Sequence, residues 1–129
     1  MKAKDTTRSA GNVSGKLAEE CAARFLAKRG LTVLTRNYRC RCGEIDLVCR
    51  DGNVLVFVEV RLRRNAGYGG ASASITPAKQ RRIVLAAQHY LALHDQAARD
   101  CRFDCVLLEG SDEIQETHIE WIPDAFAAG

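Results

Sequence analysis

Hydrophobic residues recur every three or four positions in two stretches of the chain, and this spacing predicts two helices. The first runs from Lys16 to Arg29 and is followed by Gly30, a residue typical of a helix C-terminus. The second opens with Thr76 as its N-cap and Pro77 in the first helical position, and it runs to about residue 94. Each helix should bury one face against the rest of the domain.

Shorter hydrophobic runs, rich in β-branched residues, predict five strands. They are Leu31–Tyr38, Glu44–Cys49, Val54–Leu62, Arg102–Leu108 and His118–Ile122. Between the second and third strands, Asp51-Gly52 predicts a tight hairpin turn. The order α-β-β-β-α-β-β then predicts an α/β sandwich, in which a mixed central β-sheet is flanked by helices.

Two polar segments interrupt this pattern. Residues 1–14 lack periodicity and predict a flexible N-terminal arm, which leaves residues 15–129 as a single domain. The segment from Arg63 to Ser74 is rich in Gly, Ala and Ser and predicts a loop.

Composition narrows the class of protein. Of the 129 residues, 47% are hydrophobic and 27% charged, which excludes the disordered and membrane classes. No hydrophobic run reaches membrane-spanning length, and none follows the N-terminus as a signal peptide would require, so we expect a cytoplasmic protein without a membrane partner. In that compartment the six cysteines should be free thiols. Cys40 and Cys42 lack the second ligand pair that a structural zinc site needs.

The formal net charge of +3 is too small to identify a nucleic-acid partner. The positions of the basic residues are more informative, because Lys and Arg cluster at 36–41, 61–64 and 79–82. These clusters predict contacts with phosphate, including one from Arg63. Because no base-reading motif is visible, binding should be salt-sensitive and selective for structure more than for sequence.

Acidic residues gather at the open end of the predicted hairpin. If Arg50 pairs with Asn53, the alternation of side chains places one wholly hydrophobic set on one face: Ile45, Leu47, Cys49, Val54, Val56, Val58 and Val60. The opposite face then carries Glu44, Asp46, Glu59 and Arg61 together at its end. Three neighbouring carboxylates are costly unless a cation offsets them, and Mg²⁺ needs only two or three protein carboxylates. A solvated sheet edge with ion pairs is the alternative.

The helices contribute further polar candidates. On a helical wheel, Glu19 lies at the border of the hydrophobic arc and can reach a site beneath the helix, whereas Glu20 faces solvent. Lys79 and Gln80 fall on the hydrophobic face of the second helix, in its first turn, where they can contact phosphate. For Glu19 and Lys79 the alternatives stay open: a surface carboxylate, and an ammonium that extends to water.

At these residues the chain resembles the YraN-like family, a bacterial protein family numbered 0102. This family is similar in turn to archaeal Holliday-junction resolvases and other PD-(D/E)xK nucleases. The resemblance spans about residues 15–127. It rests on the first helix, on two strand segments, on Lys79 and on the stretches 86–91, 102–104 and 121–123; the strand segments are Gly43-Glu44-Ile45-Asp46-Leu47-Val48 and Val56-Phe57-Val58-Glu59-Val60-Arg61.

The resemblance implies a restriction-endonuclease-like fold, with Asp46 and Glu59 as the two motif acids and Glu19 as the helix carboxylate that completes a Mg²⁺ or Mn²⁺ site. The catalytic set would add Arg61, which stands where the family places Lys. Lysine can exchange a proton and arginine cannot, so this departure bears directly on catalysis. A homodimer is expected by analogy only.

Three functions follow as hypotheses. The first is a Mg²⁺-dependent nuclease acting on structured DNA, in which Lys79, Gln80 and Arg63 bind phosphate. The second is a noncatalytic DNA-binding or recombination-accessory protein whose site has degenerated at Arg61. The third is an interaction protein whose acids form only structural ion pairs.

Overall fold

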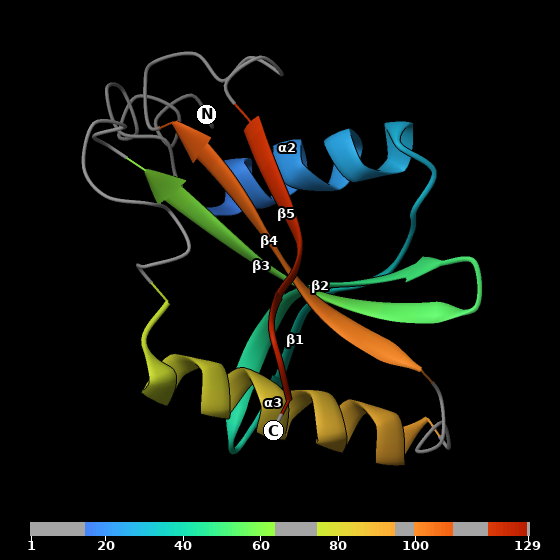
Figure 1. The fold of residues 1–129 in the computed structure, drawn as a ribbon, viewed down its shortest axis with the longest axis vertical. Coiled ribbons are helices and arrows are strands. Elements are labelled where there is room, and N and C mark those ends of the chain that lie inside the picture. The colour runs from blue at the N-terminus through green and yellow to red at the C-terminus, as the bar shows by residue number, and fades with distance from the viewer. Residues whose placement is uncertain (1–14, 64–74, 95–99, 110–118, 129) are drawn as a thin grey trace, which may run out of the picture.

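The structure, a computed structural model, describes residues 15–63, 75–94, 100–109 and 119–128 (Figure 1). Its elements are α2 (Gly15–Lys28), β1 (Thr32–Cys40), β2 (Gly43–Asp51), β3 (Val54–Arg63), α3 (Pro77–Leu93), β4 (Cys101–Glu109) and β5 (Ile119–Phe126). The predicted fold class and the predicted order of elements are both confirmed. The arm at 1–14 and residues 64–74 of the expected loop lie outside the described residues, so the domain boundary stays a prediction.

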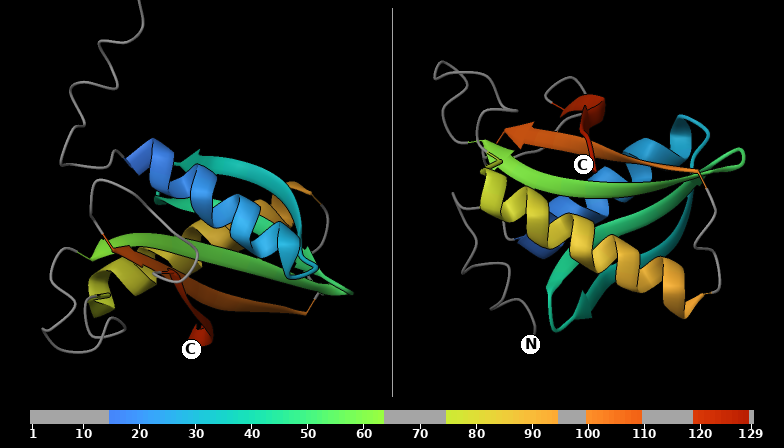
Figure 2. Two further views of the ribbon diagram at one scale, coloured as in Figure 1. Left: turned by 90° about the horizontal axis from the view of Figure 1, so that it is seen from above. Right: turned by 60° about the horizontal axis from the view of Figure 1, so that its bottom comes forward.

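The five strands form one mixed sheet in the order β1-β2-β3-β4-β5. Only β3 and β4 run parallel to each other, and the connection between them contains α3. The two helices cover opposite faces of the sheet, as the two views in Figure 2 show. Each face of the sheet therefore has its own hydrophobic layer, and the central strands are buried on both sides.

The two hydrophobic layers differ in the residues that fill them, with small side chains under α2 and aromatic rings under α3. On one side α2 brings Ala18, Ala22 and Ala23 close to the sheet, where Leu47 and Val106 are fully buried. On the other side α3 packs against aromatic rings. The ring centroids of Phe57 and Phe103 are 5.6 Å apart in a stacked arrangement, and those of Tyr90 and Phe57 are 5.9 Å apart in an edge-to-face arrangement. Thr76 caps α3 by accepting a hydrogen bond from the backbone N–H of Lys79 at 3.1 Å, as predicted.

The β2–β3 hairpin has a register two residues away from the predicted one. Asp51 pairs with Val54, so the loop is Gly52-Asn53 and Arg50 does not pair with Asn53. Gly52 supplies the positive φ of 61° that the tight turn needs, which an L residue with a side chain adopts less readily. The predicted opposing pairs are therefore wrong, but a shift of two residues by itself changes no face.

A buried carboxylate ties the last two strands together. Asp104 is 0% exposed and accepts hydrogen bonds from Arg102 Nε at 2.9 Å, Trp121 Nε1 at 2.9 Å and the backbone N–H of Asp124 at 2.8 Å. Arg102 also pairs with Asp51 at 3.1 Å, which adds the end of β2 to the network. A buried charge with this many partners is satisfied, so the Arg102–Asp104 segment and Trp121 serve the fold here.

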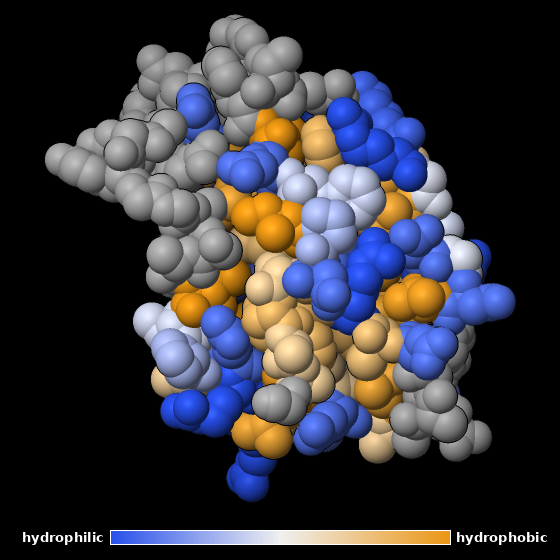
Figure 3. All heavy atoms as spheres, in the orientation of Figure 1, coloured by the Kyte–Doolittle hydropathy of each residue, from blue (hydrophilic) through white to orange (hydrophobic). Residues whose placement is uncertain are grey.

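On the face that carries β5 and α3, hydrophobic side chains form separate patches between hydrophilic ones (Figure 3). A groove of about 420 Å³ lies there between α3 and the C-terminal residues, and its described lining, which includes Val84 and Leu85, contains no carboxylate. Neither described helix is long and hydrophobic enough to cross a membrane. The polar residues singled out in the sequence lie elsewhere.

Candidate functional site

Two strands separate where the candidate acids lie. The backbone pairing of β2 with β3 extends from Asp51↔Val54 only to Leu47↔Val58. Beyond this point the backbone N–H of Val60 donates to Asp46 Oδ2 at 2.8 Å. Asp46 is thus fixed next to β3 by a side-chain contact, close to Glu59.

The separation also corrects a predicted face. Ile45 was expected on the same surface as Leu47 and Cys49, which pack under α2. In the structure Ile45 is buried in the other layer, against Ile83 and Ala87 of α3. The strict alternation assumed from the sequence does not hold where β2 leaves its partner strand.

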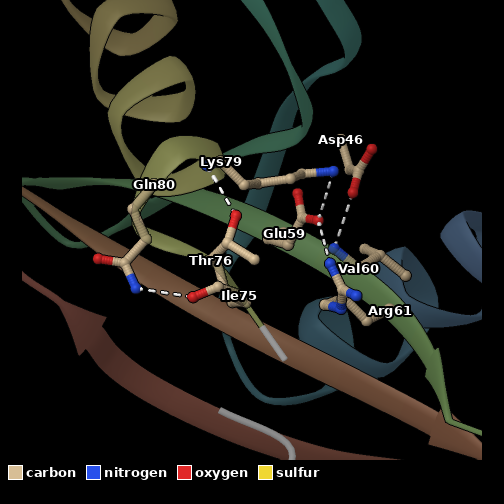
Figure 4. A network of polar contacts seen from close by, with 8 residues as sticks. All are labelled: Asp46, Glu59, Val60, Arg61, Ile75, Thr76, Lys79 and Gln80. Atoms are coloured by element: carbon tan, nitrogen blue, oxygen red, sulfur yellow. Dashed lines mark hydrogen bonds and ion pairs between the residues drawn. The ribbon is translucent and has the colours of Figure 1, made fainter. Parts of the chain in front are cut away.

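Glu59 lies at the centre of the site and is only 5% exposed. Its Oε2 atom is 3.1 Å from Lys79 Nζ and 3.5 Å from Arg61 Nη1. Figure 4 shows the side chains of Asp46, Glu59, Lys79 and Arg61 pointing toward one another from β2, β3 and the first turn of α3. The structure therefore brings together two predicted acids and two predicted cations.

Both acids hold their protons more tightly than ordinary carboxyls. Burial, with a smaller contribution from Glu19, raises the pKa of Asp46 to about 6, although the hydrogen bond from the Val60 backbone N–H opposes this shift. Burial together with the charge of Asp46 raises the pKa of Glu59 to about 7, although Lys79 and Arg61 oppose this shift. The two nearby cations do not fully compensate the two acids.

Glu19 joins the site from α2, as the helical wheel predicted. Its carboxyl lies close enough to Asp46 to contribute to the raised pKa of that acid. Glu20, the neighbouring acid, is exposed and lies 3.9 Å from Arg24, in agreement with its predicted outward direction.

Within the described ranges, no three His, Cys, Asp or Glu side chains converge as a metal ligand set. Asp46, Glu59 and Glu19 are thus near one another without forming a closed site. Magnesium requires less, because it keeps several waters and is commonly held by one or two carboxylates with substrate phosphates. The hard oxygens of Asp46 and Glu59 fit this requirement, and their raised pKa values, due mainly to burial, show that ionising both acids is costly unless a cation binds beside them.

Other candidates lie apart from the acids. The Gln80 side chain points away from the acids and donates to the carbonyl of Ile75 at 3.0 Å (Figure 4). Glu44, expected in the acidic patch, is exposed and pairs with Arg39 at 3.3 Å. Arg63 is the last residue of β3, and its side chain lies outside the described part of the chain.

Sequence reasoning missed a basic cleft beside the acids. The cleft measures about 300 Å³ and is lined by the β1–β2 turn and the first turns of α3, namely by Arg39, Cys40, Arg41, Cys42, Gly43, Glu44, Lys79, Arg82 and Ile83. Two of the three basic clusters in the sequence meet there. Gly43 lies at the contact between them, where a Cβ atom would be 2.6 Å from the carbonyl oxygen of Arg82.

The raised pKa of Glu59 predicts a pH-dependent stability. Between pH 4.5, its ordinary pKa, and about 7, the folded protein retains a proton that the unfolded chain has lost. The free energy of unfolding of the metal-free protein should fall across this interval and stay low above it. Glu59→Gln should remove this component, so that at pH 8 the variant is more stable than the parent by on the order of 1–3 kcal/mol.

Urea unfolding in a chelator at pH 4.5 and pH 8 measures this difference. Glu20→Gln, which alters an exposed acid on α2, is the matched control and should follow the parent. An identical pH dependence in Glu59→Gln and the parent would show that Glu59 is not destabilised by its surroundings.

Comparison with known proteins places the chain in a family. The model of the uncharacterised protein family UPF0102 matches residues 18–108, which includes most of α2, the acids and α3. The chain belongs to this family. The predicted resemblance to family 0102 is thereby confirmed, whereas the wider likeness to PD-(D/E)xK nucleases stays a prediction.

Several bacterial relatives are similar over nearly their whole length. A UPF0102 protein of Dechloromonas aromatica is 55% identical over 128 residues, covering 99% of this chain and 97% of the relative. A UPF0102 protein of Nitrosomonas europaea is 54% identical over 118 residues, covering 92% and 96%. One from Methylobacillus flagellatus is 53% identical over 114 residues, covering 88% and 96%.

Proposed function

We propose that the chain is a metal-dependent nuclease that hydrolyses phosphodiester bonds in structured DNA. The observation that carries this proposal is the pair of buried acids, Asp46 and Glu59, whose pKa values are raised even though Lys79 and Arg61 lie beside them. Strongly perturbed carboxyls next to a fixed cation are more typical of a functional site than of a structural ion pair.

Asp46 and Glu59 would hold the cation, Mg²⁺ or Mn²⁺. When bound, it would supply the positive charge that polarises the phosphodiester and helps to activate water. Val60 fixes one oxygen of Asp46 through its backbone N–H, and Glu19 lies beside the same carboxyl as a further oxygen ligand within reach. Because the acids must be deprotonated to bind, cation binding should displace protons and strengthen as pH rises through about 7.

Lys79 and Arg61 have different tasks in this proposal. The Lys79 side chain is 35% exposed, so its ammonium can turn from Glu59 toward a phosphate oxygen once a cation neutralises the acids. Lysine can also lose a proton in a closed complex, which makes Lys79 the candidate for proton transfer. Arg61, 29% exposed, stays charged and would orient the phosphate.

One observation favours a second function. Arg61 stands beside Glu59 where the resemblance leads one to expect Lys, and arginine does not exchange protons. If Lys79 does not take over this task, the chain is a noncatalytic DNA-binding or recombination-accessory protein that keeps the cation site.

Cleavage assays separate the two functions. The protein is incubated with end-labelled four-way junctions, flaps and linear duplexes in Mg²⁺, in Mn²⁺ and in chelator. The nuclease proposal expects cleavage of a branched substrate that needs either cation and is absent in chelator. Salt-sensitive DNA binding with no cut in any substrate would favour the accessory function instead.

A further inference from the structure

The cleft beside the acids combines features that suit one type of ligand. Arg39 and Arg41 reach it from the β1–β2 turn, and Lys79 and Arg82 reach it from α3. The one acid in its lining, Glu44, is paired with Arg39 at 3.3 Å. The lining therefore has an excess of positive charge directed at a small volume of about 300 Å³.

The cleft is held in shape by close backbone packing. The β1–β2 turn lies against the first turns of α3, and Gly43 approaches the Arg82 carbonyl so closely that a side chain cannot be accommodated. Tyr38, at the other end of this contact, hydrogen-bonds to His89 and meets Tyr90 edge to face at 5.1 Å. The backbone positions from which Arg41 and Arg82 extend are therefore fixed relative to each other, which lowers the entropic cost of bringing both side chains to one anion.

Lys79 belongs to both the cleft and the acid site. Its Nζ atom lies 3.1 Å from Glu59 Oε2, and the same side chain lines the cleft. A group bound in the cleft would therefore lie next to any phosphodiester held at Asp46 and Glu59.

We infer that this cleft binds the terminal phosphate of a nucleic-acid strand, a phosphomonoester, and that the protein thereby acts near strand ends. This inference rests on the proposed function and deepens it by naming the substrate class. A phosphomonoester carries up to two charges at one point, which suits cations converging from two elements. An internal phosphodiester carries one charge, and its neighbours call for cations spaced along a track.

The test measures binding to the full chain in chelator, so that no cleavage is needed. Three versions of one short oligonucleotide are titrated, with a 5′-phosphate, with a 3′-phosphate and with hydroxyls at both ends, and inorganic phosphate is titrated separately. We expect a terminal phosphate at one of the two ends to tighten binding about tenfold to a hundredfold, as two charge-assisted contacts would. Inorganic phosphate should compete with that oligonucleotide.

The double variant Arg41→Gln/Arg82→Gln should lose the preference for the phosphorylated end. Arg81→Gln is the matched control, because Arg81 is an exposed neighbour that lines the groove on the other side of α3. It should keep the preference. Circular dichroism checks that the double variant is folded.

Thiol protection gives a second measurement in the unaltered protein. Cys40 and Cys42 line the cleft with their sulfurs 3.1 Å apart. Although burial acts to raise it, hydrogen bonds from Cys42 and Gly43 lower the pKa of Cys40. The phosphorylated oligonucleotide should slow the alkylation of this pair, whereas exposed Cys101 should react at an unchanged rate.

Equal affinity for all three oligonucleotides, or a preference that survives in the double variant, would overturn the inference. Competition by inorganic phosphate without any preference among the oligonucleotides would mean that the cleft takes a free phosphate and not a strand end, which also overturns it. If the protein prefers the phosphorylated end but cleaves no substrate, the proposed nuclease function is rejected and the inference about the cleft stands. If it cleaves DNA but shows no such preference, the nuclease function stands and the inference about the cleft is rejected.

Discussion

Asp46→Asn and Glu59→Gln are each expected to reduce DNA cleavage about a thousandfold or more, while DNA binding in chelator stays equal or becomes tighter. The reason is that both acids are proposed to hold the cation, whose contribution to phosphoryl chemistry is worth several kcal/mol. Neither side chain is needed by the hydrophobic layers, and each substitution removes a negative charge from a site that phosphate must approach. Single-turnover cleavage of the best branched substrate measures the effect.

Glu20→Gln is the matched control for this prediction, because it removes a carboxylate from the same side of the molecule without touching the site. It should cleave at the parental rate. Cleavage by Asp46→Asn and Glu59→Gln at near the parental rate would remove both acids from the mechanism.

Lys79→Met is expected to reduce cleavage about a hundredfold, the usual contribution of a positioned proton-transfer group. It should also change the pH profile, because Lys79 lowers the pKa of Glu59 through its charge and a hydrogen bond. Without that cation, Glu59 keeps its proton to higher pH, and the rising limb of the rate profile should move upward. A residue needed only for folding would lower the rate without moving the limb.

Arg61→Lys also tests whether Lys79 is the group that transfers a proton. In the Lys79→Met background it should restore part of the lost activity, since Arg61 already lies 3.5 Å from the carboxylate and the new side chain can exchange a proton. Lys79→Met cleaving as fast as the parent with an unchanged pH profile would show that Lys79 is only an ion-pair partner.

The fold was predictable from local sequence signals, and the error in the predicted strand register arose in the β2–β3 turn. Helix α3 was predicted with its cap and first residue, because Thr76 and Pro77 act through their immediate neighbours. The hairpin register depended on which residues form the loop, and both Asp51-Gly52 and Gly52-Asn53 are compatible with a tight turn. Local chemistry alone did not distinguish them.

The acidic part of the site was predictable from the alternation of side chains along the strands and from the periodicity of the first helix. They selected Asp46, Glu59 and Glu19, which the structure brings together from β2, β3 and α2. Glu44 was expected beside them, but it pairs with Arg39, since residues 43–46 of β2 do not pair with β3. Such a divergence depends on packing against α3, and the pattern of one strand does not reveal it.

The basic cleft was beyond the reach of sequence patterns. Arg39 and Arg82 are more than forty positions apart, and they meet only because the β1–β2 turn packs against α3. For Gln80 the helical wheel predicted the correct face of α3 but not the contact that the side chain makes. Its amide donates a hydrogen bond to the carbonyl of Ile75 and is directed away from the acids.

The acid pair is tested most directly by calorimetric titration of the parent with Mn²⁺ at pH 6 and pH 8, beside the double variant Asp46→Asn/Glu59→Gln. We expect one cation per chain in the parent, tighter binding at pH 8 because protons must leave the acids first, and no binding in the double variant. Binding of Mn²⁺ to the double variant with parental affinity, or no binding to the parent at pH 8, would show that Asp46 and Glu59 do not form a cation site.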